Sequence, residues 1–287
     1  MIAWNVLFDH VAVLNFSAVP LSLQVYATDA IETPSGGFGL LPQGARPTGA
    51  GAWISLPSRF ATVRVPPENT RGPGQVVIPL ELRMPDRASP GDHVGGIVAS
   101  LRTVGRNASG QNVVLLQRVG TRVFVQVTGK LVPGLSVSGL RASYDGTLDP
   151  IGHGQTRISY VVTNTGNVLL GLGQSVSVSG LLGSKRSVVL PNVALLLPGA
   201  SVPETAVVTG VWPEFLLHAT VSARPLAVAG AKAPGLGPIS AATSIWAIPW
   251  TLIALVVLVV AVGFVAVRAR AARSARLRAG VPRVARA

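Results

Sequence analysis

An uncharged segment near the C-terminus restricts the folds open to this chain of 287 residues more than any other feature does. The segment runs from Ile245 to Val267 and contains 23 consecutive residues without an acid or a base. As an α-helix it is about 34 Å long, and the hydrocarbon core of a bilayer is about 30 Å thick. A buried helix of this length in a soluble protein normally carries a polar stripe, and this segment has none. Residues 245–267 therefore predict one transmembrane helix in contact with the lipid bilayer.

The flanks of this segment predict its orientation. Trp246 and Trp250 lie at one end, and indole rings prefer the membrane interface. Arg268 and Arg270 open a basic tail, 268–287, that contains seven arginines and no acid. Because basic flanks stay on the cytoplasmic side, we expect a single-pass plasma-membrane protein with a cytoplasmic tail and an extracellular N-terminal region.

The first residues do not have the pattern that directs export. Residues 1–16 carry no basic n-region, no long apolar stretch and no small-residue cleavage site. We therefore expect an upstream segment with a signal peptide in the natural reading frame. The alternative is a tail-anchored scaffold whose body lies in the cytoplasm.

Composition excludes several classes of function. The net charge is +13, but 13 − 7 leaves only +6 outside the tail, and aromatic residues make up 5% of the chain. A nucleic-acid-binding face needs clustered basic residues with interleaved aromatic rings, so we expect no nucleic-acid partner. Cysteine is absent, which rules out disulfides, thiol nucleophiles and thiolate metal sites.

The region before the apolar segment has the pattern of antiparallel β-sandwiches. Short runs with period-2 alternation recur at intervals of about 8 to 12 residues and are separated by Gly, Pro, Asn and Asp. The predicted fold is all-β, with two immunoglobulin-like antiparallel β-sandwich modules, 1–131 and 132–226, followed by one C-terminal transmembrane helix. The small residues of 227–244 predict a flexible stalk. The predicted strands are 9–15, 21–29, 53–56, 61–65, 75–84, 95–104, 113–116, 122–128, 135–144, 155–164, 175–179, 187–190, 205–211 and 218–225.

Turn signals recur at strand ends. In each module an apolar strand ends in asparagine, at Asn15 and at Asn164. Asparagine tolerates a left-handed backbone and hydrogen-bonds its own turn, so both are predicted to be turn residues. Pro90-Gly91 predicts a turn in which glycine supplies a positive φ. Gly95-Gly96 predicts a bulge or a close approach of backbone, either to a glycan or to a neighbouring strand.

Several ordered motifs resemble a known family. They are VYATDA at 25–30, GAWI at 51–54, PDRASPGDHVGGIV at 85–98, QRVGTRV at 117–123, TNTGNV at 163–168 and LPG at 197–199. In this order and spacing they resemble the DUF916 family, also called WxL-interacting proteins, in an actinobacterial-type form, over about residues 9–210. The resemblance implies a bacterial cell-surface protein with a β-sandwich ectodomain and a C-terminal transmembrane helix. It also implies that the first module binds peptidoglycan.

Four side chains of the first module are candidate ligand contacts. Arg118 and Arg122 lie in an otherwise apolar stretch, and guanidinium groups bind carboxylates such as those of a wall peptide. Their alternative partners are Asp86 and Asp92, and Asp92 is itself a candidate contact. Trp53 can stack on a sugar ring or pack in the core of the sandwich.

No catalytic or metal motif is present in the sequence. The chain has eleven acids and four histidines, without an HExxH, GxSxG or P-loop pattern. The acidic segment around Asp145 and Asp149 has too few oxygen ligands at regular spacing for calcium. We expect a protein without cofactor, metal or catalytic residues, which binds peptidoglycan or another envelope protein. An accessory subunit that positions a separately encoded envelope enzyme is the alternative.

Overall fold

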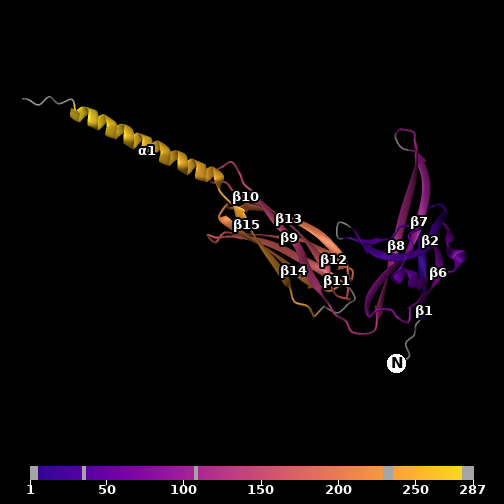
Figure 1. Ribbon diagram of the computed structural model, residues 1–287. Coiled ribbons are helices and arrows are strands. Elements are labelled where there is room, and N and C mark those ends of the chain that lie inside the picture. The colour runs from indigo at the N-terminus through magenta and orange to yellow at the C-terminus, as the bar shows by residue number, and fades with distance from the viewer. Residues whose placement is uncertain (1–5, 34–36, 107–108, 229–234, 280–287) are drawn as a thin grey trace, which may run out of the picture.

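The computed structural model describes residues 6–33, 37–106, 109–228 and 235–279, with side chains of the last helix described as far as residue 273. Two β-sandwich modules follow one another along the chain, and a long helix projects from the second (Figure 1). The predicted fold of two immunoglobulin-like antiparallel β-sandwich modules with one C-terminal apolar helix is confirmed.

Module 1 packs two antiparallel sheets against each other. One sheet has the order β1-β6-β4, and the other has the order β3-β2-β7-β8 with β5 also paired to β2. Alternate side chains of both sheets point inward, and Val65 and Ile78 are fully buried in the resulting core. The strands are β1 (Val6–Asn15), β2 (Leu21–Glu32), β3 (Phe38–Leu40), β4 (Ile54–Ser55), β5 (Thr62–Val65), β6 (Gly74–Arg83), β7 (Gly91–Arg106) and β8 (Asn112–Val127), with 3₁₀ turns η1 (Ala50–Trp53) and η2 (Ser58–Phe60).

Module 2 repeats the sandwich with a larger second sheet. Its sheets have the orders β13-β10-β9 and β12-β11-β14-β15. Inward-facing side chains of both sheets form one core, in which Ile158, Leu172 and Leu217 are fully buried. The strands are β9 (Leu135–Asp145), β10 (Gly154–Asn164), β11 (Leu170–Gly180), β12 (Lys185–Leu196), β13 (Ser201–Val211), β14 (Phe215–Leu226) and β15 (Ile239–Ala247).

The two predicted asparagine turns have the same geometry. The Oδ1 atom of Asn15 accepts a hydrogen bond from the backbone amide two residues on, at 2.9 Å, and its Nδ2 donates to the carbonyl four residues on, at 2.8 Å. The corresponding distances at Asn164 are 3.0 and 2.8 Å. Both side chains are buried. Each asparagine also donates to the carbonyl of a distant strand, Val65 or Leu196, so it fixes its turn to the module.

The joint between the modules is tightly bonded. The positive φ predicted for Gly91 is confirmed, at 125°, but the predicted turn at Pro90-Gly91 is wrong: the hydrogen-bonded turn lies earlier, where the amide of Ala88 donates to the carbonyl of Pro85, and Gly91 already begins β7. A Cβ atom there would also meet the carbonyl oxygen of Asn167, which belongs to module 2. The side chain of Asn167 donates to the carbonyls of Pro90 and Lys130, both at 2.9 Å, and accepts from the amide of Val132 at 2.7 Å. The side chain of this one asparagine of module 2 thus connects its own loop to the segment at Pro90 and to the linker at 130–132.

The predicted flexible stalk is wrong for its second half. Residues 239–247 form β15, which pairs with β14 without a register shift. Along β15 the inward side chains, which include Ile239 and Ile245, alternate with exposed ones. Small alanine and serine residues hide this period of two in the sequence, because they resemble a linker in composition. Residues 229–234 of the predicted stalk lie outside the described residues.

Helix α1 (Trp250–Ala279) begins five residues later than the predicted segment. Ile245 to Ala247 belong to β15, and Pro249 restricts the residue before it to extended backbone, which keeps the helix from beginning earlier. Residues 250–273 are long and apolar enough to cross a membrane, and none of this span is buried against the rest of the protein.

Candidate binding surface on module 1

The hairpin of β7 and β8 extends beyond the rest of module 1 (Figure 1). Both strands are 16 residues long, and their register is continuous from Gly91↔Val127 to Arg106↔Asn112. Strand β2 supports β7 only as far as Ser100, so the distal part of the hairpin is a two-stranded arm. Its exposed apolar side chains are Val104, Val113, Val114, Leu115 and Leu116, and the exposed Val119 lies next to the arm, opposite Ala99 in the supported part of the sheet.

Strand β8 is the edge strand of its sheet. The prediction of two separate strands, 113–116 and 122–128, is corrected, because the residues between them continue the ladder with β7. An edge strand presents a row of backbone N–H and C=O groups that can pair with another extended chain. Charged residues and short length normally protect such an edge, whereas much of β8 is long, exposed and apolar.

An apolar groove runs beside this edge strand. It has a volume of about 460 Å³ and lies between β1 and β8, which are edge strands of the two opposing sheets. Its floor comes from the core side of β2 and β7, including Leu23 and Ala99, and Val119 lies on its β8 wall. Val119 has 77% of its surface exposed. The sandwich is therefore open along this side, next to a strand that is available for pairing.

The four predicted contact residues do not form one cluster. Even-numbered residues of β7 and β8 share one face of the sheet, and odd-numbered residues share the core face. Arg118, Arg122 and Asp92 are on the outer face. Trp53 lies in η1, packs against the core of module 1 and faces His93 with a ring separation of 4.7 Å.

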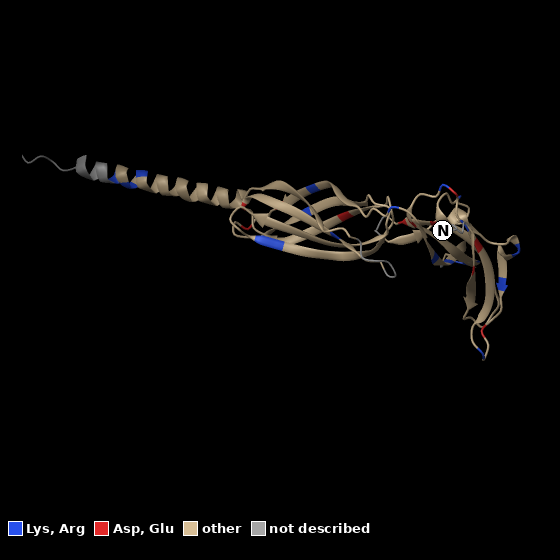
Figure 2. Ribbon diagram, turned by 90° about the horizontal axis from the view of Figure 1, so that it is seen from below, with Lys and Arg blue, Asp and Glu red and all other residues tan. Residues whose placement is uncertain are grey.

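The two arginines differ in their surroundings. Nη1 of Arg118 contacts the carbonyl of Leu41 at 3.4 Å, and the rest of the side chain is exposed. The guanidinium of Arg122 lies over the rings of Phe38 and Phe124, at 5.3 and 5.8 Å. Figure 2 shows that charged residues are sparse along the ribbons of both modules. Arg118 is therefore the more accessible cation for an acidic partner.

Asp92 has a structural position between the modules. Its side chain is buried, with Oδ1 accepting from Nε2 of Gln126 and Oδ2 accepting from the backbone amide of Leu169, both at 2.8 Å. Leu169 belongs to module 2, so the carboxylate fixes the joint. This contact joins residues 77 positions apart, so no local pattern predicts it.

A second carboxylate at the joint, that of Glu32, is partly buried without the hydrogen bonds that Asp92 has. Burial raises the pKa of Glu32 above its ordinary value, and the nearby backbone amide of Leu197 offsets only part of the shift. Within the described part of the chain, neither carboxylate oxygen has a hydrogen bond of good geometry. The ionised form of Glu32 is therefore disfavoured in the folded protein. Sequence reasoning missed this residue because nothing near it in the chain predicts burial.

The predicted close approach at Gly95-Gly96 serves internal packing. A Cβ atom on Gly96 would meet the side chain of Leu40, and one on Gly120 would meet the same leucine. Gly95 lies in the same way against the backbone of Gly51. These glycines let the segment around β3 and η1 rest on the sheet, so they form no surface for a glycan.

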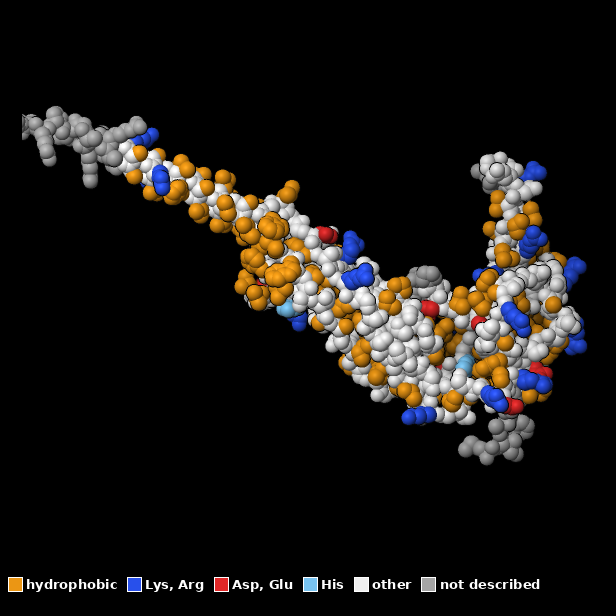
Figure 3. Space-filling view, in the orientation of Figure 1, with side chains coloured by type: hydrophobic (Ala, Val, Ile, Leu, Met, Phe, Trp, Pro, Cys, Tyr) orange, Lys and Arg blue, Asp and Glu red, His pale blue; other side chains and the backbone are white. Residues whose placement is uncertain are grey.

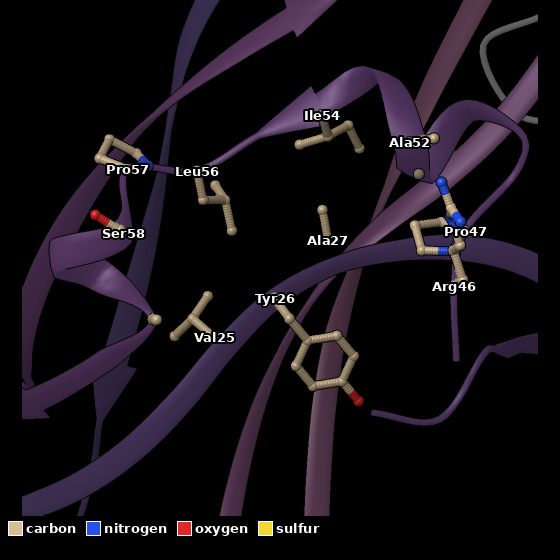
Figure 4. A pocket seen from close by; sticks show the side chains of 12 residues that line it. Val25, Tyr26, Ala27, Arg46, Pro47, Ala52, Ile54, Leu56, Pro57 and Ser58 are labelled. Atoms are coloured by element: carbon tan, nitrogen blue, oxygen red, sulfur yellow. The ribbon is translucent and has the colours of Figure 1, made fainter. Parts of the chain in front are cut away.

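A further hollow opens where the edge of β2 is unpaired between β5 and β3 (Figure 4). Val25, Ala27, Ile54 and Leu56 point toward its centre, and Arg46 lies at one side. Arg46 and Tyr26 are the ionisable side chains in its wall, so it lacks the paired acid and base that hydrolysis needs. Among the residues that the structure describes, no group of three or more His, Asp or Glu side chains is placed to hold a metal ion.

The predicted membrane-interface residues lie at the two ends of the apolar helix. Trp246 and Trp250 are exposed where β15 leads into α1, and Arg268 stacks over Phe264 near the other end, with Arg270 also exposed. From Trp250 to Arg268 the helix rises about 27 Å, close to the thickness of about 30 Å of a hydrocarbon core.

Comparison with known proteins gives only distant likenesses. No family model matches the chain, and no curated protein matches it. Among solved structures, the CupB2 chaperone of Pseudomonas aeruginosa is similar at 13% identity and a TM-score of 0.33. A chain of a chaperone–tip adhesin complex of CFA/I fimbriae has 9% identity and a TM-score of 0.43, and the class 5 fimbrial chaperone CfaA has 11% and 0.40. Each alignment covers 83% of this chain and 92% of the other. These similarities are too low to transfer a function.

Proposed function

We propose that this chain is a single-pass membrane protein of the bacterial envelope whose ectodomain binds another envelope protein and catalyses no reaction. The open edge of module 1 is the observation that supports this best. Strand β8 carries exposed apolar side chains along an unpaired edge, and an apolar groove lies beside it. An extended segment of a partner can add a strand to β8 and place alternate side chains in the groove.

Charge indicates what kind of segment fits. Residues 93–127, which include most of the hairpin, contain four arginines and no acid. Two copies of β8 paired antiparallel about Gly120 would place Arg118 opposite Arg122, and like charges directly opposite are destabilising. A segment with alternating apolar side chains and acidic residues avoids this repulsion. The favoured partner is therefore a different protein rather than a second copy.

Peptidoglycan is the second candidate partner. The family resemblance implies it, and the exposed guanidinium of Arg118 favours it because arginine binds carboxylates such as those of wall peptides. Asp92 and Trp53 are not part of this proposal, since one is occupied at the joint and the other packs against the core.

A photo-crosslinking amino acid at Val119, in the full chain in its own cells, tests both candidates. A protein partner gives an adduct of discrete higher mass that muramidase leaves unchanged. A wall partner gives an adduct that stays with the insoluble wall until muramidase releases it. The same amino acid at Val189, which is 75% exposed on module 2, is the matched control. Equal labelling at both positions would show that the open edge binds nothing in particular.

Membrane orientation is tested separately by protease added to spheroplasts. A single-pass protein with an outer N-terminal region loses both modules and keeps a small fragment containing 250–287. A tail-anchored scaffold keeps both modules until the membrane is dissolved, which would overturn the proposed localisation.

A further inference from the structure

Large apolar side chains gather at the end of module 2 from which α1 projects. Figure 3 shows this group as the largest cluster of hydrophobic atoms outside the helix in that view. We name it the apolar collar. Leu148 is 91% exposed and Leu182 is 82% exposed, although neither is near a chain terminus. The collar consists of Leu148, Ile151, Leu181, Leu182, Trp212, Phe215, Trp246 and Trp250.

The strand registers place all these residues at one end of the module. The β9–β10 loop follows the pair Asp145↔Gln155, and the β11–β12 turn follows the pair Ser179↔Lys185. The β13–β14 loop lies at the same end, because Phe215 pairs with Ala247, the last residue of β15. Three loops from separate parts of the sequence thus surround the start of α1.

Contacts between the loops hold the collar in a fixed shape. The buried carboxylate of Glu214, in the β13–β14 loop, accepts a hydrogen bond from the backbone amide of Leu182. Trp212 of the same loop packs edge-on against His153 of the β9–β10 loop, at 4.3 Å. Phe215 has a φ of 64°, which is unusual for a bulky residue, and its ring is half exposed. An exposed apolar surface built with such constraints marks a binding site.

The lipid bilayer is the occupant that the connection to α1 favours. Ile248 and Pro249 are the residues between the paired end of β15 and the first residue of α1. Two extended residues span at most about 7 Å. If α1 crosses the bilayer, the collar therefore lies at the membrane surface, where Trp, Phe and Leu side chains insert readily. No flexible stalk separates the two.

The ionisable groups at this end do not favour a charged partner. Asp145 ends β9, Asp149 lies in the β9–β10 loop and Glu214 lies in the β13–β14 loop, while Lys185 and Arg186 follow the β11–β12 turn, so three acids face two bases and neither sign dominates. Tyr144, His153 and His218 are the other titratable groups nearby. Insertion of apolar side chains, rather than attraction to anionic lipid, accounts for the surface.

We infer that the apolar collar of module 2 inserts into the membrane interface and seats the ectodomain directly on the bilayer. This inference rests on the proposed membrane anchoring by α1. It gives module 1, with its open edge, a set height and orientation above the membrane, instead of the free movement that a flexible stalk allows.

The absence of cysteine permits a direct test in the full chain, reconstituted in phosphatidylcholine vesicles. A fluorophore is attached to the single cysteine of Leu182→Cys or of Leu148→Cys, and quenching by lipids brominated near the headgroup is measured. The matched control is Val189→Cys, four residues beyond Lys185 and so about 13 Å farther along β12. We expect at least about three-fold stronger quenching at the two collar positions, as interfacial insertion requires.

A second variant separates insertion from mere tethering. The fluorophore is placed on Ile151→Cys, and its quenching is measured with and without the further substitutions Leu148→Ser and Leu182→Ser. All three side chains are exposed, so these substitutions are expected to leave the fold intact. Insertion predicts that the serines lower the quenching to the level of Val189→Cys. Unchanged quenching overturns the inference, as does a fluorescence change without bromine quenching, which would indicate contact between copies. Vesicle flotation distinguishes failure of this inference from failure of the proposed membrane anchoring. If the chain floats with the vesicles but its collar positions are not quenched, α1 anchors the protein and the collar does not insert. If the chain does not float, α1 is not an anchor.

Discussion

The two modules share a sandwich plan but differ in how completely they close. In module 2 a row of core side chains, including Ile158, Leu172 and Leu217, has no exposed surface, because β15 extends the second sheet. In module 1 most core side chains keep a few per cent of exposure, and one side opens as the groove between β1 and β8. The exposed apolar residues of module 2 are mainly in its loops, whereas those of module 1 include an edge strand. The closed module is suited to support and the open one to binding.

The largest expected effect comes from truncating one core leucine in each module to alanine. Leu217→Ala removes a side chain from a closed core and is expected to lower the free energy of unfolding of module 2 by about 3–5 kcal/mol. Leu23→Ala removes a side chain that also borders the groove, where neighbours and water can relax, and is expected to cost about 2–3 kcal/mol in module 1. Hydrogen exchange followed module by module in the full chain measures both. Equal costs would contradict the contrast between closed and open cores.

A smaller effect is expected at the shared turns. Asn15→Ala and Asn164→Ala each leave buried backbone groups without partners, at a cost of about 1–3 kcal/mol in the module concerned. Three hydrogen bonds match in both modules, but Asn15 also donates to the carbonyl of Pro66 and accepts from the hydroxyl of Ser17. We therefore expect Asn15→Ala to cost more than Asn164→Ala, by no more than about 1.5 kcal/mol. Asn→Asp at the same positions keeps the acceptor and loses the donor, and the same exchange measurement reads it. A larger difference between Asn15 and Asn164, or a greater cost at Asn164, would show that the turns are alike in shape but not in energy.

Features that depend on residues close together in the sequence were predicted, whereas features that depend on distant residues were not. The strands and both asparagine turns depend on residues within about a dozen positions, and the period-2 pattern and the Asn side chain reveal them. Strand β15 was missed because Ala241 and Ala242 give almost no contrast between inward and outward positions. Strand β3 was also missed, because its three residues are too few to show an alternating pattern.

The candidate site required long-range pairing that local patterns do not contain. Arg118, Arg122 and Trp53 were grouped by residue type, but the register of β7 with β8 puts the arginines on the outer face and the tryptophan elsewhere. The groove is visible only when β1 and β8 are known to be edge strands of opposite sheets. The apolar collar likewise comes from loops that meet only after module 2 has folded. Exposed Leu181 and Leu182 beside a glycine were the one local sign of it.

The smallest expected effect is a pH dependence of the joint, where the two modules meet. Because the folded state raises the pKa of Glu32, the folded protein keeps a proton that the unfolded chain releases between the ordinary carboxyl pKa and the raised value. Stability is therefore lost as pH rises through that window, and the joint is weaker above the window than below it.

Glu32→Gln keeps the shape of the side chain and removes the charge. We expect it to raise the melting temperature of the full chain by about 1–2 °C at pH 7.5, the scale of a change below 1 kcal/mol in a protein of this size. At pH 3.5, where Glu32 is protonated in both states, the variant and the parent are expected to melt together. Glu68→Gln, at an exposed position of module 1, is the matched control and should change neither value. A stabilisation by Glu32→Gln that persists unchanged at pH 3.5 would mean that shape or hydrogen bonding, rather than the buried charge, limits how firmly the open module is held to the closed one.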